Sequence, residues 1–339
     1  MPDTLSLADA RMRFARASAP PCAIELLGDS PAAIRTQELV RRAATIDAGV
    51  LLTADAGVHA ESVAQELHDR SRRAAGPFIT IDCQAGDAAR IDGLLFGSPE
   101  ALAASDLEPV TADSRIAAAR GGTLFLRDVA DLPAACQAKL ARIARDGEVR
   151  IDGVPLAMAW RLVASALPSV DAEVQANRLR ADLYRRLSAV RIDLPPLRDR
   201  AEDVPTIAMR LLDEVCQAQS GRTRTLTSAA LALVGALAWP GNVAELQRVL
   251  ERVVAESDDE VIQVEHLLPA LRLDARPAAF RPAPNLREAR LRFERDYIAA
   301  VLQHHGWRMA EAAQTLGIQR PNLYRKARQL GIPLSRVSD

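Results

Sequence analysis

The chain has 339 residues, of which 49% are hydrophobic and 26% are charged, a composition typical of a globular protein with two or three domains. No apolar run approaches the ~18 residues of a membrane span, and the N-terminus lacks the apolar core of a secretory signal. These features predict a cytoplasmic protein without a membrane partner. The four cysteines are widely spaced and form no CxxC pair, so neither a zinc site nor a disulfide framework is expected.

The formal net charge of −1 conceals an uneven distribution along the chain. Residues 281–339 carry 11 basic and 5 acidic side chains, so a basic C-terminal segment follows an acidic body. Such a segment favours contact with a polyanion such as nucleic acid. Only two of the 43 basic residues are lysines, Lys139 and Lys326.

The first part of the chain alternates between two kinds of segment. Residues 1–22 are polar and alanine-rich, and we expect a short tail there, with no separate sensor domain. From residue 23, short β-branched or apolar runs alternate with helical stretches, which predicts a parallel sheet covered by helices on both faces. The predicted strands are Val50–Thr53, Phe78–Asp82, Thr123–Leu126 and Arg161–Ser165. The predicted helices are Pro31–Ala44, Glu61–Arg73 and Leu132–Asp146.

The strands are expected to stop at Pro195–Pro196. Residues 194–271 are then predicted to form an all-helical subdomain after an α/β subdomain of residues 23–193. Its predicted helices are Val204–Ala218, Thr227–Leu237, Val243–Glu256 and Val264–Leu271. Residues 272–285 contain three prolines, which indicates a linker.

The last unit, residues 286–339, is predicted to contain three helices. Aromatic and apolar residues recur every four positions from Phe293 to Val301, which indicates a long amphipathic helix over residues 286–305. The two shorter helices, which flank a glycine turn, are expected over Arg308–Leu316 and Gln319–Leu330.

Two short helices around a glycine turn are typical of a helix-turn-helix, and Ala312 and Ala313 would let them approach closely. Arg320, Asn322 and Arg325 are candidates for base contacts, because arginine and asparagine can read base edges with paired hydrogen bonds. The full set of candidate DNA-binding residues is Arg320, Asn322, Tyr324, Arg325, Lys326 and Arg328. Within this set we expect Lys326 and Arg328 at phosphates, whereas Tyr324 fits either base stacking or core packing. The alternative for the unit is an ordinary basic helix at the surface of a bundle.

The segment AAQTLGIQRPNLYRKARQLGI (312–332) resembles the Fis-type helix-turn-helix of bacterial enhancer-binding regulators of the NtrC-like family. Other motifs of this chain are similar to the AAA+ domain with which these regulators remodel sigma-54 RNA polymerase. They are VLLTADAGVHAE (50–61), GPFITIDC (76–83), LLFG (94–97), GGTLFLRD (121–128), LRADLYRRL (179–187), LPPLRDRAEDVP (194–205) and WPGNVAELQ (239–247). The resemblance implies an α/β fold, with an AAA+ P-loop-type parallel sheet and a helical lid subdomain, followed by an all-α Fis-type helix-turn-helix domain. A receiver domain is not expected.

The resemblance also implies the partners. Double-stranded DNA is expected at the helix-turn-helix, and a second copy of the chain is expected at the helix of residues 286–305. The AAA+ domain would support a larger oligomer, and RNA polymerase or an active relative is a further candidate partner. Arg180 and Arg186 match arginines that act between subunits in the family.

The chain departs from the family pattern at the nucleotide site. A P-loop needs glycines and a lysine around the phosphates, and the family sequence GESGTGKE reads ADAGVHAE here, with Ala60 in place of the lysine. Arg127–Asp128 replaces the Asp-Glu pair that serves Mg²⁺ and the attacking water, and Ala244 replaces a lid arginine. The residues of this vestigial site are Ala54, Asp55, Gly57, His59, Ala60, Glu61, Arg127, Asp128 and Ala244.

These departures imply a protein that is not an enzyme, with no catalytic residue, no metal and no ATP or Mg²⁺ cofactor. We expect Arg127 to pair with Asp55 or Asp128 in the vacant pocket. The GAFTGA motif that contacts sigma-54 is also absent between Ser98 and Arg120.

Three functions remain under consideration. The first is a sequence-specific DNA-binding regulator whose AAA+ domain acts as a scaffold rather than an ATPase. The second is an ATP-binding, sigma-54-dependent activator. The third is a sensor that binds a small neutral ligand in the old nucleotide pocket, which the alanines at positions 54, 56 and 60 make more apolar.

Overall fold

The computed structural model describes residues 23–98, 107–151, 154–157, 159–219, 221–274, 298, 302, 307–315 and 319–329. The chain divides into two units, Met1–Asp274 and Ala275–Asp339. The predicted tail of residues 1–22 and most of the predicted helix of residues 286–305 lie outside the described residues.

A five-stranded parallel sheet forms the centre of the first unit, with the strand order β2-β4-β7-β1-β8. Its strands are β1 (Val50–Thr53), β2 (Phe78–Asp82), β4 (Thr123–Arg127), β7 (Arg161–Ala166) and β8 (Val190–Asp193). The central strands β4, β7 and β1 are buried on both sides, so their sequences are nearly continuous apolar runs. The four predicted strands are confirmed to within one residue. The edge strand β8 was not predicted, because only one of its four residues is buried.

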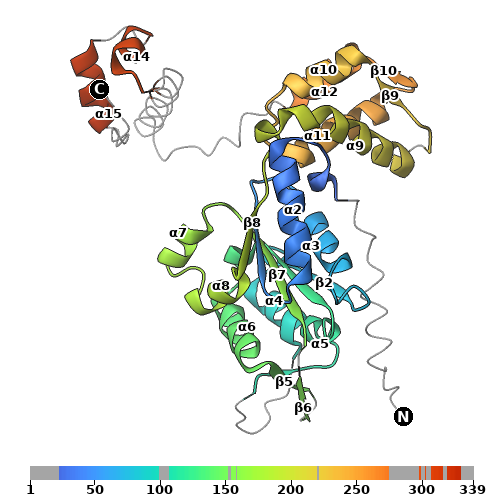
Figure 1. The fold of residues 1–339 in the computed structure, drawn as a ribbon, viewed down its shortest axis with the longest axis vertical. Helices are drawn as coiled ribbons and strands as arrows, with labels where there is room; N and C mark the ends of the chain where they lie inside the picture. Colours follow the sequence, from blue (N-terminus) through green and yellow to red (C-terminus); the bar gives the residue numbers. More distant parts are fainter. Residues whose placement is uncertain are drawn as a thin grey trace. The chain divides into compact units, whose positions relative to one another are not determined.

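Helices cover both faces of this sheet (Figure 1). One core lies on the side of α2 (Pro31–Thr45) and α3 (Ala60–Asp69), and Leu52 of β1 belongs to it. The other core includes the neighbouring residue Leu51, because successive side chains of a strand point to opposite faces. It contains residues of α4 (Ala88–Phe96), α5 (Arg115–Ala118), α6 (Ala134–Asp146), α7 (Val170–Gln175) and α8 (Ala181–Leu187). Helix α3 ends four residues before its predicted end, and turns follow it.

Three short strands form a second sheet that was not predicted. They are β3 (Pro109–Val110), β5 (Glu148–Ile151) and β6 (Val154–Ala157), with β5 antiparallel to β6 and parallel to β3. Strands of two to four residues with mixed burial give too short a pattern for a period to be recognised.

The four predicted helices after residue 200 are present. They are α9 (Val204–Gln219), α10 (Ser228–Ala236), α11 (Asn242–Glu256) and α12 (Val264–Asp274), and we call the segment from α9 to α12 the lid. The lid is not purely helical, since β9 (Thr225–Leu226) and β10 (Val261–Ile262) pair in parallel. Helix α12 continues three residues into the predicted linker of residues 272–285. Two short helices, η3 (Leu197–Asp199) and η4 (Ala201–Asp203), lead into the lid, and a third, η1 (Ile24–Leu26), opens the described chain.

The second unit contains α14 (Met309–Thr315) and α15 (Arg320–Gln329), and the described residues Ile298 and Leu302 are helical. A small apolar core joins these segments, and its buried members include Ala312, Ala313 and Leu323. The predicted close approach of two helices at the alanines is confirmed by their burial. In the described part of the chain, no helix has the length and apolar character to cross a membrane.

Candidate nucleotide pocket and DNA-binding helix

A cavity of about 1330 Å³ lies at the carboxyl ends of β1, β4 and β7. This edge of a parallel sheet is where α/β proteins generally bind ligands. Eight of the nine residues predicted for the vestigial nucleotide site line it: Ala54, Asp55, Gly57, His59, Ala60, Glu61, Arg127 and Asp128. The ninth, Ala244, is not in the lining, but its backbone N–H donates to the carbonyl oxygen of Gly57 at 3.0 Å.

The loop between β1 and α3, residues 54–59, is in close contact with the lid. Gly57 has a φ of +82°, and a Cβ atom there would lie 2.1 Å from the carbonyl oxygen of Gly241. Glycine is therefore required at this position both by the backbone conformation and by the approach of the lid. Helix α3 begins with the buried Ala60, where the family has its lysine.

The charge of the cavity is opposite to that of a phosphate site. Among the described residues that line it there are six carboxylates, two guanidinium groups and no lysine. A triphosphate carries several negative charges, which this lining would repel. The described lining thus lacks the lysine that a P-loop places at the phosphates, and its carboxylates outnumber its guanidinium groups.

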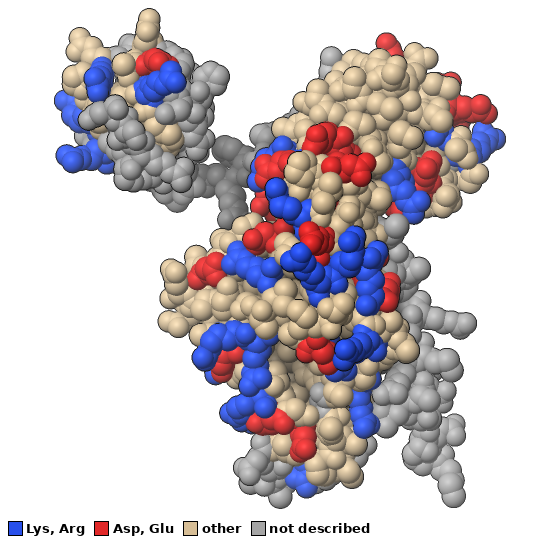
Figure 2. All heavy atoms as spheres, viewed as in Figure 1, with Lys and Arg blue, Asp and Glu red and all other residues tan. Residues whose placement is uncertain are grey.

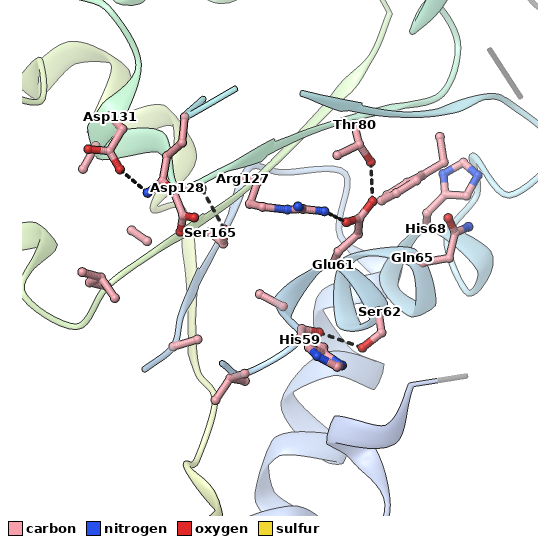
Figure 3. A pocket seen from close by; sticks show the side chains of 18 of the residues that line it. His59, Glu61, Ser62, Gln65, His68, Thr80, Arg127, Asp128, Asp131 and Ser165 are labelled. Atoms are coloured by element: carbon pink, nitrogen blue, oxygen red, sulfur yellow. Dashed lines mark hydrogen bonds and ion pairs between the residues drawn. The ribbon is translucent and has the colours of Figure 1, made fainter. Parts of the chain in front are cut away.

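Arg127 at the end of β4 pairs with Glu61 in the first turn of α3 (Figure 3). Its Nη1 also lies 3.5 Å from Oδ2 of Asp82, and the hydroxyl of Thr80 donates to Glu61 Oε1 at 2.9 Å. The predicted pairing of Arg127 with Asp55 or Asp128 is wrong. The register of the sheet places Asp82 of β2 directly opposite Arg127, so the guanidinium extends toward β2 and α3.

The two predicted partners of Arg127 have other surroundings. Asp55 pairs with Arg198, whose Nη1 lies 2.7 Å from Asp55 Oδ2. Asp128 has a left-handed backbone with φ of +54°, and its N–H donates to Ser165 Oγ at 3.0 Å. Burial raises the pKa of Asp128, and the charges of Asp131 and Asp82 raise it further, while Arg127 opposes them. A guanidinium and a carboxylate with a raised pKa thus occupy the places expected for the Mg²⁺ and water ligands.

The two arginines expected at a subunit interface have partners within the chain. Arg180 makes two hydrogen bonds to Asp182, at 2.7 and 3.0 Å. Arg186 donates to the main-chain oxygen of Ala144 at 2.7 Å. Both side chains are exposed, and their role between subunits stays a prediction.

Three residues around the loop were missed by the sequence analysis. Glu25 and Arg200 form a buried ion pair, and Asn242 at the start of α11 bonds to the main chain of the loop. Arg200 and Asn242 lie inside the motifs of residues 194–205 and 239–247, so these motifs could have identified them. Glu25 lies in no motif, and nothing in the sequence connects it to the cavity.

Helix α15 separates into a buried and a basic face. Leu323 and Ala327 are buried in the small core, whereas Arg320, Asn322, Arg325 and Arg328 are exposed, as a DNA-reading surface requires. Tyr324 and Lys326 are half-buried.

Tyr324 was expected either to stack on bases or to pack in the core. Its ring packs against the core, and the guanidinium of Arg320 lies over it at 5.8 Å from the ring centre. Arg325 donates to Asn322 Oδ1 at 3.2 Å, so two candidate base-reading side chains have neighbours on their own helix.

The surfaces of the two units differ in charge. Figure 2 shows Lys and Arg intermixed with Asp and Glu over the visible face of the first unit, whereas basic residues predominate on the described part of the second. Among the described residues, no group of three or more His, Cys, Asp or Glu side chains is arranged to hold a metal ion.

Three family models match consecutive parts of the chain. They are the Sigma-54 interaction domain over residues 26–193, the AAA+ ATPase lid domain over residues 198–281, and the Bacterial regulatory protein, Fis family, over residues 290–330. The order of the matches is the order of the sheet, the lid and the basic helix.

Similar proteins carry regulatory names. The chain is 34% identical over 330 residues to the transcriptional regulatory protein ZraR of Klebsiella oxytoca, covering 95% of this chain and 73% of ZraR. It is 32% identical over 316 residues to a Nif-specific regulatory protein of Azotobacter vinelandii, covering 92% of this chain but 60% of that protein.

A solved structure agrees with these matches. The crystal structure of NtrX from Brucella abortus in complex with ATP superimposes with a TM-score of 0.63 at 29% sequence identity, covering 90% of this chain and 69% of NtrX. The combination of fold, motif order and identity leads to one conclusion: the chain belongs to the NtrC-like family of bacterial regulators with a sigma-54 interaction domain and a Fis-type helix-turn-helix.

Proposed function

We propose that this chain is a transcriptional regulator that binds double-stranded DNA through α15 and uses its AAA+ unit as a scaffold, not as an ATPase. The observation that carries the proposal is the pairing of Arg127 with Glu61 and Asp82. It puts a guanidinium where a nucleotide site needs a magnesium ligand. DNA binding also implies that the protein acts in the cytoplasm.

The proposal includes the absence of an ATP or Mg²⁺ cofactor. Three positions that should supply positive charge or a metal ligand carry Ala60, Arg127 and Ala244, and neither alanine side chain can pair with a phosphate. With Lys139 and Lys326 the only lysines of the chain, and neither in the cavity lining, no other lysine takes over the role.

A nucleotide titration tests this part of the proposal. Thermal shift and phosphate release are measured with ATP and Mg²⁺, with Brucella abortus NtrX as the positive control, because it has been crystallised with ATP. A restored variant, Ala60→Lys/Arg127→Asp/Ala244→Arg, is the control within this chain. We expect no shift and no release for the natural chain. Release well above the blank would instead favour the ATP-driven sigma-54 activator, and a shift without release would favour a nucleotide sensor.

The assembly is proposed to follow the family. The helix of residues 286–305 would pair two copies, which would present two α15 helices to a palindromic DNA site. The AAA+ unit would add a larger oligomer, with itself or with an active relative, in which Arg180 and Arg186 exchange their partners within the chain for partners on a neighbour. RNA polymerase is the remaining partner proposed. Mass measurement in solution, with and without DNA, tests the oligomeric part: a monomer under both conditions would contradict it.

The size of the cavity supports a second candidate function, that of a ligand sensor. A space of about 1330 Å³ remains although its phosphate-binding groups are missing. Ala54, Ala166 and Leu167 give part of its wall an apolar character, which suits an uncharged ligand. Screening a library of neutral metabolites by thermal shift, with Leu167→Asp as the cavity control, tests it. Absence of any shift that depends on Leu167 would reject it.

A further inference from the structure

Glu25 joins three parts of the first unit that are far apart in the sequence. Its Oε1 accepts the backbone N–H of His59 at 2.7 Å. Its Oε2 pairs with Nη2 of Arg200, and Nη1 of Arg200 donates to the main-chain oxygen of Glu25 at 2.6 Å. The side chains of Glu25 and Arg200 are 1% and 0% exposed, so water does not reach the pair.

The N–H group that Glu25 accepts has a particular place in the fold. His59 is the last loop residue before α3, and backbone N–H groups at this junction hold phosphate in nucleotide-binding loops. Here the N–H already bonds to a carboxylate. The Glu25 carboxylate therefore occupies a backbone N–H group that would otherwise be available to a bound phosphate.

The lid contacts the same loop from the other side. Asn242 Nδ2 donates to the carbonyl oxygen of Ala56 at 2.9 Å, and Asn242 Oδ1 accepts the N–H of Leu197 at 2.9 Å. The N–H of Ala244 reaches the carbonyl oxygen of Gly57 at 3.0 Å. Between residues 56 and 59, the loop thus forms hydrogen bonds both to the lid and to Glu25 in η1.

The short helix η1, which contains Glu25, packs against the lid. Ile24, next to Glu25, is a buried member of the apolar core of the lid. Both Nη atoms of Arg200 donate hydrogen bonds to Glu25, whereas its buried Nε has no hydrogen-bond partner. An unpaired buried donor is unfavourable, so the pairing with Glu25 must hold this arginine in place.

We propose that Glu25 is a built-in substitute for a bound phosphate, and that with Arg200 it locks the loop of residues 54–59 and the lid in one conformation without nucleotide. In this arrangement the position of the lid does not report a nucleotide state. The inference rests on the proposed loss of nucleotide binding, but its test is performed without nucleotide.

Hydrogen exchange of the full chain, followed by mass spectrometry, tests the lock. The variant Glu25→Met/Arg200→Met removes the acceptor of the His59 N–H without leaving a buried charge, and pairs replaced in this way generally stay folded. We expect amides of residues 54–62 to exchange at least ten times faster, with those of β4 unchanged. Glu25→Gln/Arg200→Met returns an uncharged acceptor and should restore most of the protection.

Arg198→Met is the matched control. It removes the Asp55–Arg198 pair, which joins the same loop to η3, two residues before Arg200. Unlike Arg200, the Arg198 side chain is 51% exposed. Exposed pairs contribute little, so its loop amides should exchange as in the natural chain. Loop exchange within twofold of the natural chain in the double methionine variant would overturn the proposal, leaving Glu25 and Arg200 as a core ion pair only.

A second route covers the case in which the double variant does not fold. His59→Pro deletes the donor and leaves the Glu25–Arg200 pair intact, and the φ of His59, −84°, is close to the proline range. Faster exchange at the neighbouring loop amides supports the lock, and unchanged protection overturns it. Adding ATP and Mg²⁺ to the natural chain separates the two proposals: slower loop exchange would refute the loss of nucleotide binding, whatever the variants show.

Discussion

The cavity at the sheet edge and the basic helix α15 differ in how many of the features expected from the family they contain. The cavity has its position, its loop and its contacts with the lid, but a guanidinium and alanines stand at the charged positions that a nucleotide needs. Helix α15 has both its buried face and its exposed basic face. The contrast shows that the packing around a site can persist when its charged residues are replaced, because packing and charge depend on different side chains.

The largest expected effect concerns the buried pair of Glu25 and Arg200, which lies outside the cavity lining. Arg200→Met leaves the buried Glu25 without its charged partner, and breaking such a pair costs about 3–5 kcal/mol. We expect urea unfolding to show this loss for the single variant and near-natural stability for Glu25→Met/Arg200→Met. A cost below 1 kcal/mol for the single variant would mean that the pair contributes little to stability.

The next effect concerns the DNA surface. Arg320→Ala and Asn322→Ala should each cost ~1–3 kcal/mol of specific affinity and relax the base preference, whereas Lys326→Ala should weaken all sequences alike and flatten the salt dependence. Selection from random DNA followed by titration at several salt concentrations measures both. Intact specificity in Arg320→Ala would show that the groove is read by other residues.

A smaller effect concerns the pH dependence of stability that Asp128 in the cavity produces. Asp128 has a raised pKa, so the folded state holds its proton more tightly than the unfolded state. Its presence therefore costs stability as the pH rises from its ordinary pKa through its raised one, and Asp128→Asn should stabilise the protein at pH 7 but not below pH 4. Because the group is only half-buried, screening limits the gain to a few tenths of a kcal/mol up to about 1 kcal/mol. Urea unfolding at both pH values measures it, and an equal effect at both would contradict a pKa of Asp128 raised by burial and by the nearby carboxylates.

The smallest effect concerns how α15 is organised. Tyr324 packs in the core and carries the Arg320 guanidinium over its ring, so Tyr324→Phe should keep the specific affinity. Tyr324→Leu should lose ~0.5–1 kcal/mol, the value of an exposed cation–π contact. Equal losses in the two variants would assign the hydroxyl, and not the ring, to DNA binding.

The predictions from sequence succeeded where burial controls the pattern. The central strands β1, β4 and β7 are apolar on both faces, and the buried alanines of α14 lie where small residues were expected. The edge strand β8 and the short sheet of β3, β5 and β6 were missed, since short or half-exposed strands give weak periodicity. The predicted residues of the vestigial nucleotide site were found because three motifs, at residues 50–61, 121–128 and 239–247, contain them.

Residue identity alone establishes which chemical groups are present: the missing lysine, the arginine at position 127 and the basic segment at the end of the chain are all visible in the sequence. The partners of these groups depend on the fold. The register between β2 and β4 directs Arg127 to Asp82 and Glu61, and the packing of Ile24 in the lid brings Glu25 to His59 and Arg200. Electrostatic contacts act over a few ångströms, and residues 25, 59 and 200 reach that distance only after the chain has folded.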